Sequence, residues 1–177
     1  MEFYGVNNCL LLLLLVSSLA YSCGDNPNAM AQGPFKDNAF NNGLVCFQSS
    51  PDKRDVDFYQ SYSKSNGEYN RKIDTFNYAD APAEVLSVFF TPIAGERNVV
   101  VLLRWSVNYS TSGILYPYHY EVKTYQSNDG SDYELYLDSD KDAALSSYQT
   151  KINGKVSNYA LDNAIKIKKY LHSRYGE

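Results

Sequence analysis

From residue 43 onward, apolar and polar positions alternate along the chain with a period of two, and β-branched and aromatic residues fill most of the apolar positions. Clusters of turn-forming residues interrupt the alternation, for example at residues 64–67 and 91–98. This pattern predicts β-strands, because successive side chains of a strand point to opposite faces of its sheet. The strands predicted in this way cover residues 44–50, 56–63, 68–78, 84–90, 98–109, 118–126 and 132–138.

The most apolar of these runs, residues 98–109, reads NVVVLLRWSVNY. Near-continuous apolarity is typical of a strand that is covered on both faces, so we expect this strand to lie in the centre of the sheet. Alternation places Trp105 on one face together with Val101 and Leu103. The sequence therefore predicts that Trp105, the only tryptophan, is largely buried.

A tight turn is predicted between the last two strands. Asn128, Asp129 and Gly130 have the residue types of such a turn, since Asp-Gly tolerates the positive φ angles that it requires. We therefore expect residues 118–126 and 132–138 to be antiparallel neighbours.

Apolar residues adopt a helical spacing near the end of the chain, with Ser157 as a suitable N-cap and Gly176 just beyond the end. The apolar positions of this predicted helix are Ala160, Leu161, Ala164, Ile167 and Leu171. Together, these patterns predict an α+β fold, in which a predominantly antiparallel β-sheet of about seven strands carries one C-terminal α-helix packed on it. Residues 44–177 are predicted to form a single β-rich globular domain.

The N-terminal region carries signals of export. An apolar run over residues 9–16 contains six consecutive leucines but is shorter than the roughly 20 residues that a membrane-spanning helix needs. Small residues at Ala20 and Ser22 then fit cleavage by a signal peptidase before Cys23. We therefore expect residues 1–22 to be a signal peptide and the mature chain to begin at Cys23.

The small residue before Cys23 also resembles part of the lipobox of bacterial lipoproteins, in which the cysteine is acylated and becomes the N-terminus. The sequence departs from that pattern at Leu19, one position too far from the cysteine, and at Tyr21, where a small residue is usual. The resemblance implies lipidation of Cys23. The alternative is a disulfide between Cys23 and Cys46, because these two cysteines remain after cleavage.

Residues 23–43 are rich in Gly, Asn, Pro and Asp, which predicts a flexible tether between Cys23 and the globular domain. A membrane would then be contacted only through a lipid on Cys23. In either case we expect an exported protein, which is periplasmic or anchored to the outer membrane as a lipoprotein.

Charge and composition narrow the class of partner. The formal net charge is -4, and the basic residues are scattered apart from a group near the C-terminus, so nucleic acid is not an expected partner. The chain contains 17 tyrosines. Tyrosine combines an apolar ring with a polar hydroxyl group and therefore suits half-buried strand positions and interfaces.

His119 is the strongest candidate for chemistry, because alternation places it on one strand face with Glu121 and Lys123. This group lacks the third partner that a metal site or a catalytic relay needs, which favours a solvated strand face. Motifs that carry a catalytic nucleophile are absent. We therefore expect no catalytic residues and no enzymatic activity, with a hydrolase that uses carboxylates outside any motif as a less favoured alternative.

Three alternating aspartates, Asp138, Asp140 and Asp142, imitate the first half of an EF-hand calcium loop. However, Ala143 and Gln149 stand where that loop requires glycine and glutamate. We therefore expect a solvated turn, no metal site and no cofactor.

Tyr116, Tyr118 and Tyr120 are the predicted partner-binding residues, because they gather where a connection enters a strong strand. The alternative is that these tyrosines cover a face of the sheet and pack under the helix, as aromatic residues of a core do. The favoured function is an exported envelope protein that binds or neutralises a protein partner, as the immunity protein of a secreted toxin does. A structural or assembly lipoprotein of the bacterial envelope is the main alternative.

Overall fold

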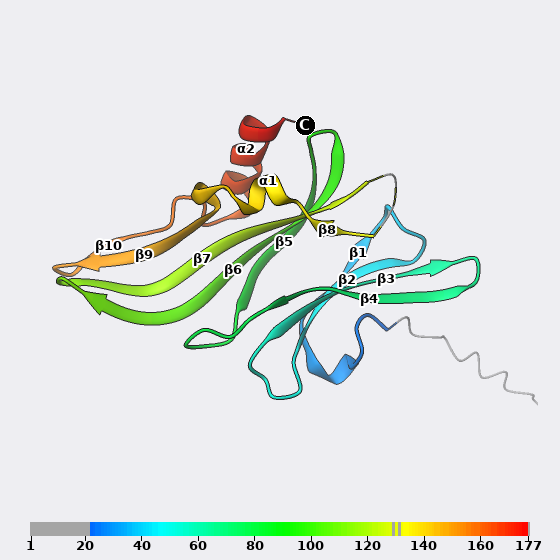
Figure 1. Cartoon of the computed structure of the whole chain (residues 1–177), viewed down its shortest axis with the longest axis horizontal. Helices are drawn as coiled ribbons and strands as arrows, with labels where there is room; N and C mark the ends of the chain where they lie inside the picture. Colours follow the sequence, from blue (N-terminus) through cyan, green and yellow to red (C-terminus); the bar gives the residue numbers. More distant parts are fainter. Residues whose placement is uncertain (1–21, 129, 131, 177) are drawn as a thin grey trace, which may run out of the picture.

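A computed structural model describes residues 22–128, 130 and 132–176. In this part of the chain, ten strands form two antiparallel sheets that pack face to face, and a helix, α2, covers the outer face of the second sheet (Figure 1). The predicted combination of mostly antiparallel β-structure with a C-terminal helix is confirmed. Two sheets with ten strands replace the single sheet of about seven strands.

Sheet A has the strand order β1-β2-β3-β4. Its strands are β1 (Met30–Asp37), β2 (Gly43–Ser49), β3 (Val56–Lys64) and β4 (Gly67–Phe76). Sheet B has the order β10-β9-β7-β6-β5, and β8 pairs with β7 beside this path. Its strands are β5 (Glu84–Ile93), β6 (Glu96–Thr111), β7 (Ile114–Ser127), β8 (Glu134–Leu135), β9 (Ser146–Ile152) and β10 (Lys155–Ser157). The helical elements are η1 (Pro27–Ala29), α1 (Leu137–Asp140), η2 (Ala143–Leu145) and α2 (Ala164–Tyr175).

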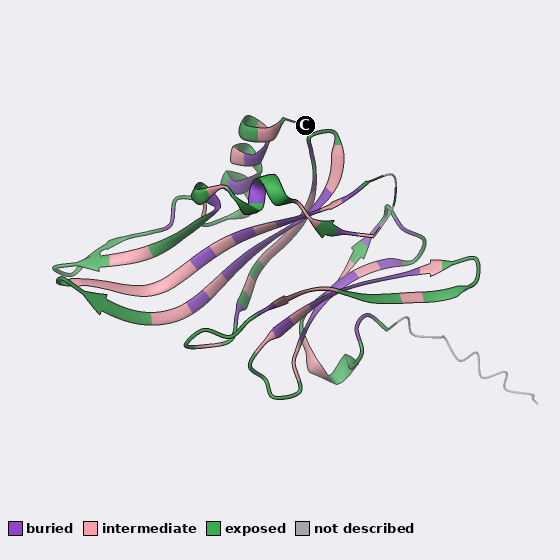
Figure 2. Cartoon of the chain, in the orientation of Figure 1, coloured by how far each residue is buried: buried purple, intermediate pink, exposed green. Residues whose placement is uncertain are grey.

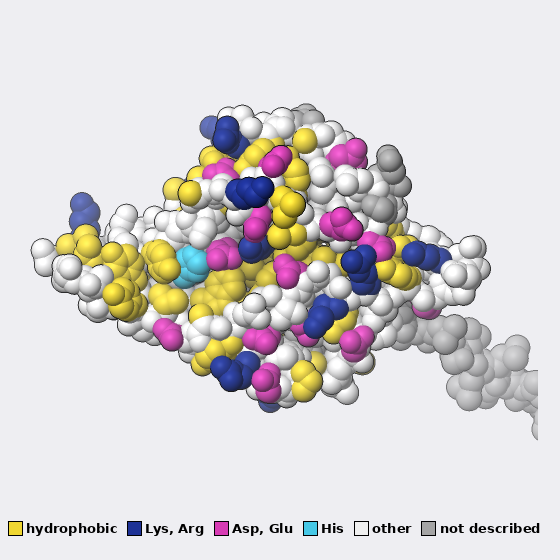
Figure 3. Space-filling view, viewed as in Figure 1, with side chains coloured by type: hydrophobic (Ala, Val, Ile, Leu, Met, Phe, Trp, Pro, Cys, Tyr) yellow, Lys and Arg dark blue, Asp and Glu magenta, His cyan; other side chains and the backbone are white. Residues whose placement is uncertain are grey.

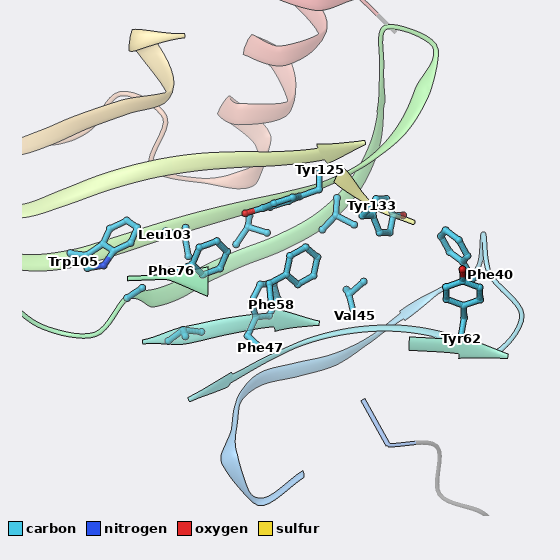
Figure 4. Packing of buried hydrophobic residues seen from close by; sticks show 14 residues of the cluster. Phe40, Val45, Phe47, Phe58, Tyr62, Phe76, Leu103, Trp105, Tyr125 and Tyr133 are labelled. Atoms are coloured by element: carbon cyan, nitrogen blue, oxygen red, sulfur yellow. The ribbon is translucent and has the colours of Figure 1, made fainter. Parts of the chain in front are cut away.

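Aromatic side chains fill the space between the two sheets. Phe47 of β2 stacks on Phe58 of β3 with 4.9 Å between the ring centroids, and Phe58 also packs against Tyr125 of β7 at 4.9 Å. All three side chains are 0% exposed and lie between the sheets (Figure 4). Burial is concentrated where the two sheets overlap (Figure 2). Each sheet therefore covers the apolar face of the other. The fold has two packed layers of β-structure where the sequence predicted one.

The most apolar strand lies inside the molecule, as predicted. β6 pairs with β5 on one side and with β7 on the other. Val101 and Leu103 pack between the sheets, whereas Val100 packs on the side of α2, and all three are 0% exposed. Trp105 is 7% exposed, and its indole N–H donates a hydrogen bond to the Asn77 carbonyl at 3.0 Å. The prediction of a buried tryptophan on a doubly covered strand is confirmed.

The predicted hairpin partner of β7 is much shorter than expected. Tyr125 pairs with Leu135 and Gln126 with Glu134, so the antiparallel arrangement is confirmed. Residues 137 and 138, at the end of the predicted strand over residues 132–138, belong to α1 instead. β9 pairs with β7 along the same edge, over residues 114–121 of β7. Only a short part of that edge is therefore available for pairing with β8.

Helix α2 begins later than predicted. The side chain of Asn163 is the N-cap and accepts a hydrogen bond from the Lys166 N–H at 3.1 Å. Ser157, the predicted N-cap, is instead the last residue of β10. Apolar spacing alone cannot select among several residues that are suitable caps, whereas the strand pairing of β10 with β9 removes Ser157 from the helix.

Residues 23–43, predicted as a flexible tether, form part of the fold instead. β1 pairs with β2, and the short helix η1 lies directly before β1 in the chain. The Gln48 side chain holds the first residues, because it donates to the Cys23 carbonyl at 2.8 Å and accepts from the Asp25 N–H at 3.1 Å. The segment has few apolar residues of its own, but sheet A supplies both a strand edge and side-chain partners for it.

Cys23 and Cys46 form a disulfide beneath this segment. Cys23 is 2% exposed, Cys46 is 0% exposed, and Tyr59 packs against the pair. A sulfur atom in a disulfide cannot carry a thioether-linked lipid, so the two alternatives for Cys23 exclude each other.

The predicted signal peptide lies outside the described residues apart from Ser22. No helix of the described part is long and apolar enough to cross a membrane.

Replacing Cys23 and Cys46 together by serine should lower the free energy of unfolding by about 3 kcal/mol, because the disulfide restricts the unfolded chain. The two residues are 23 positions apart in the sequence. Urea denaturation of the variant and of the wild-type protein measures the difference. Wild-type protein unfolded in the presence of a reductant is the control and should lose the same stability. Equal stability of all three samples would contradict a structural role for the disulfide.

Candidate functional site

Near the turn that joins β6 to β7, the strands β6, β7 and β9 extend beyond sheet A, so sheet A does not cover the face that is turned toward it there (Figure 1). A row of aromatic rings leads onto this face, since Trp105 pairs with His119 and His119 pairs with Tyr148 on neighbouring strands. The ring centroids of Trp105 and His119 are 5.8 Å apart, and those of His119 and Tyr148 are 4.6 Å apart. Tyr116 packs against Tyr148, and Tyr109 lies beside Tyr116. We call these five residues the aromatic row.

The aromatic row becomes more exposed with distance from sheet A. Trp105 is 7% exposed, whereas Tyr148 and Tyr109 are 48% and 58% exposed. Hydrophobic side chains gather over the projecting part of sheet B (Figure 3). Contiguous exposed apolar surface on a folded protein marks an interaction site more often than isolated apolar residues do. This face is therefore a candidate binding surface.

At the base of the aromatic row, a cleft of about 420 Å³ lies between the end of β4 and the strands β6 and β7. This volume is in the range of sites that take small ligands or single side chains. Its walls include Asp74, Phe76, Trp105, His119, Glu121 and Lys123. Trp105 and His119 belong to both the cleft and the aromatic row, so the two features form one continuous surface.

Hydrogen bonds and ion pairs hold the charged groups of the cleft. Lys123 Nζ lies 2.6 Å from Asp140 Oδ1 and 3.7 Å from Glu121 Oε2. Burial lowers the pKa of Lys123, but the hydrogen bond to Asp140 and the nearby carboxylate charges raise it by more, so the ammonium group stays charged. Asp74 accepts a hydrogen bond from the Tyr125 hydroxyl at 2.7 Å. Burial and the charge of Asp74 raise the pKa of Tyr125 well above its ordinary value.

His119 lies within the aromatic row and not on the solvated strand face that was predicted. Burial lowers its pKa, and the charge of Glu121 opposes this less strongly, so the imidazole is neutral at pH 7. Its Nε2 atom lies 2.9 Å from Ser146 Oγ and 3.8 Å from Glu121 Oε1. In a catalytic triad the serine and the carboxylate engage different ring nitrogens, whereas here both approach Nε2. The arrangement is therefore not that of a triad.

Only Tyr116 of the three predicted partner-binding tyrosines belongs to the aromatic row. Tyr120 is 8% exposed and stacks on Tyr159, with 5.5 Å between the ring centroids. Tyr118 packs on the same side as Tyr120, and the guanidinium group of Arg104 lies 4.5 Å from its ring centroid. Tyr120 is thus buried in the cluster that includes Ile167 and Leu171 of α2, which agrees with the alternative that the tyrosines pack under the helix and not with a binding role. The segments that follow β7 cover this side of the strand, which its local pattern does not indicate.

The three alternating aspartates do not act together. Asp140 binds Lys123, whereas the Asp142 carboxylate accepts hydrogen bonds from the hydroxyl groups of Tyr170 and Tyr175. Within the residues that the structure describes, no three potential metal ligands come together. Asp142 therefore ties α2 to the segment that precedes β9.

Tyr109, Tyr148 and Asp74 were not identified from the sequence as site residues. Tyr109 could have been found, because strict alternation from Trp105 places it on the same face. Tyr148 lies in a segment with no clear periodicity, and only the pairing of β9 with β7 brings it next to His119. Asp74 reaches the cleft because sheet A packs against sheet B.

Comparisons of the chain with protein-family models, with curated proteins and with solved structures give no match. The function proposed for the protein therefore depends on the aromatic row and the cleft.

Proposed function

We propose that this protein is an exported binding protein that holds a protein partner on its aromatic row. The observation that carries the proposal is a row of five rings that begins at the buried Trp105 and continues to Tyr148 and Tyr109 on the part of sheet B that sheet A leaves uncovered. Aromatic side chains dominate the energetics of protein interfaces, because they bury a large area and lose little conformational entropy. Their mutual packing holds the rings in place before a partner arrives.

The packing of the rings favours a protein partner over a carbohydrate. A sugar ring packs on the open face of an aromatic side chain. Trp105, His119 and Tyr148 instead stack on one another with interplanar angles of 29° and 28°. Tyr116 and Tyr148 form an edge-to-face contact. The contact with His119 covers one ring face of Tyr148, and Trp105 is buried, so fewer open ring faces remain for a sugar than five separate exposed rings would offer.

The proposed role is to bind or neutralise a partner outside the cytoplasm, as the immunity protein of a secreted toxin does. The Cys23–Cys46 disulfide supports export, because disulfides persist in oxidising compartments. The same bond weighs against an anchored lipoprotein, whose lipid would require the Cys23 sulfur. We therefore favour a protein that is released into the periplasm or the medium.

Affinity capture from an envelope extract of the producing cells tests this function. The disulfide-bonded protein is used as bait beside a Tyr109→Ser, Tyr148→Ser double variant. We expect the wild-type bait to enrich a partner and the variant to recover at least about tenfold less of it, because aromatic residues that a partner buries contribute a large share of the binding energy. Both positions are exposed, so their replacement should leave the melting temperature nearly unchanged.

Ile165→Ser is the matched control, since Ile165 is 83% exposed and lies on α2, away from the aromatic row. This bait should capture the partner as well as the wild type does. Equal capture by all three baits would contradict the proposal. Self-association of the wild-type protein through the aromatic row, seen by sedimentation equilibrium and lost in the double variant, would assign the face to a second copy instead.

A further inference from the structure

We infer that the partner held by the aromatic row inserts an arginine side chain into the cleft at the base of that row. This inference rests on the proposed function and adds the chemistry of the residue that the partner supplies. The position of the cleft, its aromatic walls and its charge each favour a guanidinium group.

The cleft is continuous with the aromatic row. Trp105 and His119 line both, so a partner that lies on the row reaches the cleft without leaving the surface. The volume of about 420 Å³ accommodates a long side chain. Trp105 and Phe76 contribute aromatic walls, and a guanidinium group packs well against aromatic rings because it is planar and weakly hydrated.

Carboxylates outnumber cations in and beside the cleft. Asp74 and Glu121 line it with Lys123, whose charge is matched by Asp140 at 2.6 Å. Glu121 lies 3.7 Å from Lys123 Nζ and 3.8 Å from His119 Nε2, and both distances exceed that of a hydrogen bond. Among the described residues, no donor forms a hydrogen bond with the Glu121 carboxylate. An arginine offers that carboxylate two parallel N–H donors.

The second carboxylate is held by neutral donors only. Asp74 accepts hydrogen bonds from the Tyr125 hydroxyl and from the Thr75 N–H, each at 2.7 Å. These bonds orient the carboxylate without cancelling its charge. His119 adds no compensating charge at pH 7, because burial keeps its pKa below the ordinary value. The cleft therefore retains an excess of negative charge.

Other occupants fit these observations less well. An anion would meet the carboxylates of Asp74 and Glu121, and the one cation among the described residues that line the cleft, Lys123, is already paired with Asp140 at 2.6 Å. A metal ion would need several converging ligands, and no such group occurs in the part of the chain that the structure describes. The formal net charge of -4 also favours the approach of a basic partner.

Fluorescence titration with N-acetyl-L-arginine amide tests the inference directly. Trp105 is the only tryptophan and lines the cleft, so its emission reports on binding there. We expect a saturable change with the arginine compound and none with N-acetyl-L-citrulline amide, which has a similar shape without the charge. N-acetyl-L-lysine amide should bind more weakly, because its ammonium group stacks less well and cannot form the paired hydrogen bonds.

Glu121→Gln should weaken binding of the arginine compound about tenfold, because it removes the charge that the guanidinium group pairs with. Glu134→Gln is the matched control, since it makes the same chemical change at an exposed position of β8. This control should bind as the wild type does. Asp74→Asn, which keeps an acceptor for Tyr125, is the second variant and should also weaken binding. Melting temperatures verify that each variant is folded.

Equal responses to the arginine and citrulline compounds, or undiminished affinity in both Glu121→Gln and Asp74→Asn, would overturn the inference. The inference and the proposed function fail separately. If Glu121→Gln bait captures a partner as well as wild-type bait does, and the capture still requires the aromatic row, then the proposed function stands and the arginine contact is wrong. If the titration succeeds but no capture depends on the aromatic row, then the proposed function is wrong and only an arginine-binding cleft remains.

Discussion

Replacement of Phe58 by alanine is expected to lower the free energy of unfolding by about 4 kcal/mol, because it opens a cavity between the two sheets. Phe58 is 0% exposed and contacts Phe47 in sheet A and Tyr125 in sheet B, each with 4.9 Å between the ring centroids. No polar group is left without a partner by this change, so the loss measures packing alone. Urea denaturation followed by circular dichroism gives the value.

Leu137→Ala is the control for Phe58→Ala, because Leu137 is 59% exposed. Its effect should stay within about 0.5 kcal/mol. A loss below about 1 kcal/mol for Phe58→Ala would mean that the sheets do not depend on each other for stability, in conflict with the packing between them.

Replacement of Asp37 by alanine is expected to cost about 3 kcal/mol, because the buried Tyr133 hydroxyl loses its acceptor and the partly exposed Arg97 guanidinium group loses its carboxylate. Asp37 is 1% exposed and accepts hydrogen bonds from Arg97 Nη2 at 2.6 Å and from the Tyr133 hydroxyl at 2.7 Å. It also accepts from the Ala39 N–H at 3.1 Å. The change thus breaks a contact between β1 of sheet A and β6 of sheet B.

Asp37→Asn separates charge from hydrogen bonding. Asparagine keeps an oxygen acceptor of the same size, so this variant should lose clearly less stability than Asp37→Ala. Both variants are measured by urea denaturation at pH 7. Wild-type stability in Asp37→Ala would show that the contact between Asp37 of β1 and Arg97 of β6 does not stabilise the fold.

Packing between the sheets also sets the shape of the candidate site. Asp74 and Phe76 come from β4 of sheet A, whereas Trp105 and Glu121 come from β6 and β7 of sheet B. The Tyr125 hydroxyl bridges the two groups through Asp74 at 2.7 Å. Changes that shift one sheet against the other should therefore alter the cleft before they alter the outer part of the aromatic row, which belongs to sheet B alone.

The sequence by itself determined the features that depend on a single strand or helix, namely which of its side chains share a face. Near-continuous apolarity identified β6 as a strand covered on both sides and predicted the burial of Trp105. Alternation placed His119, Glu121 and Lys123 together on one face, and the spacing of Ile167 and Leu171 identified a C-terminal helix. These inferences succeed because side-chain direction follows directly from the local backbone geometry.

Tertiary structure alone decided what lies against each face. A period of two shows that a strand has an apolar face, but it does not say whether a helix, a second sheet or solvent covers that face. Tyr120 is buried and Tyr109 is exposed for this reason, although both lie in strongly alternating segments. Residues 23–43 joined sheet A because β2 offers an edge and Arg97 a partner for Asp37. Contacts between residues far apart in the sequence supply that stabilisation, and no local pattern contains them.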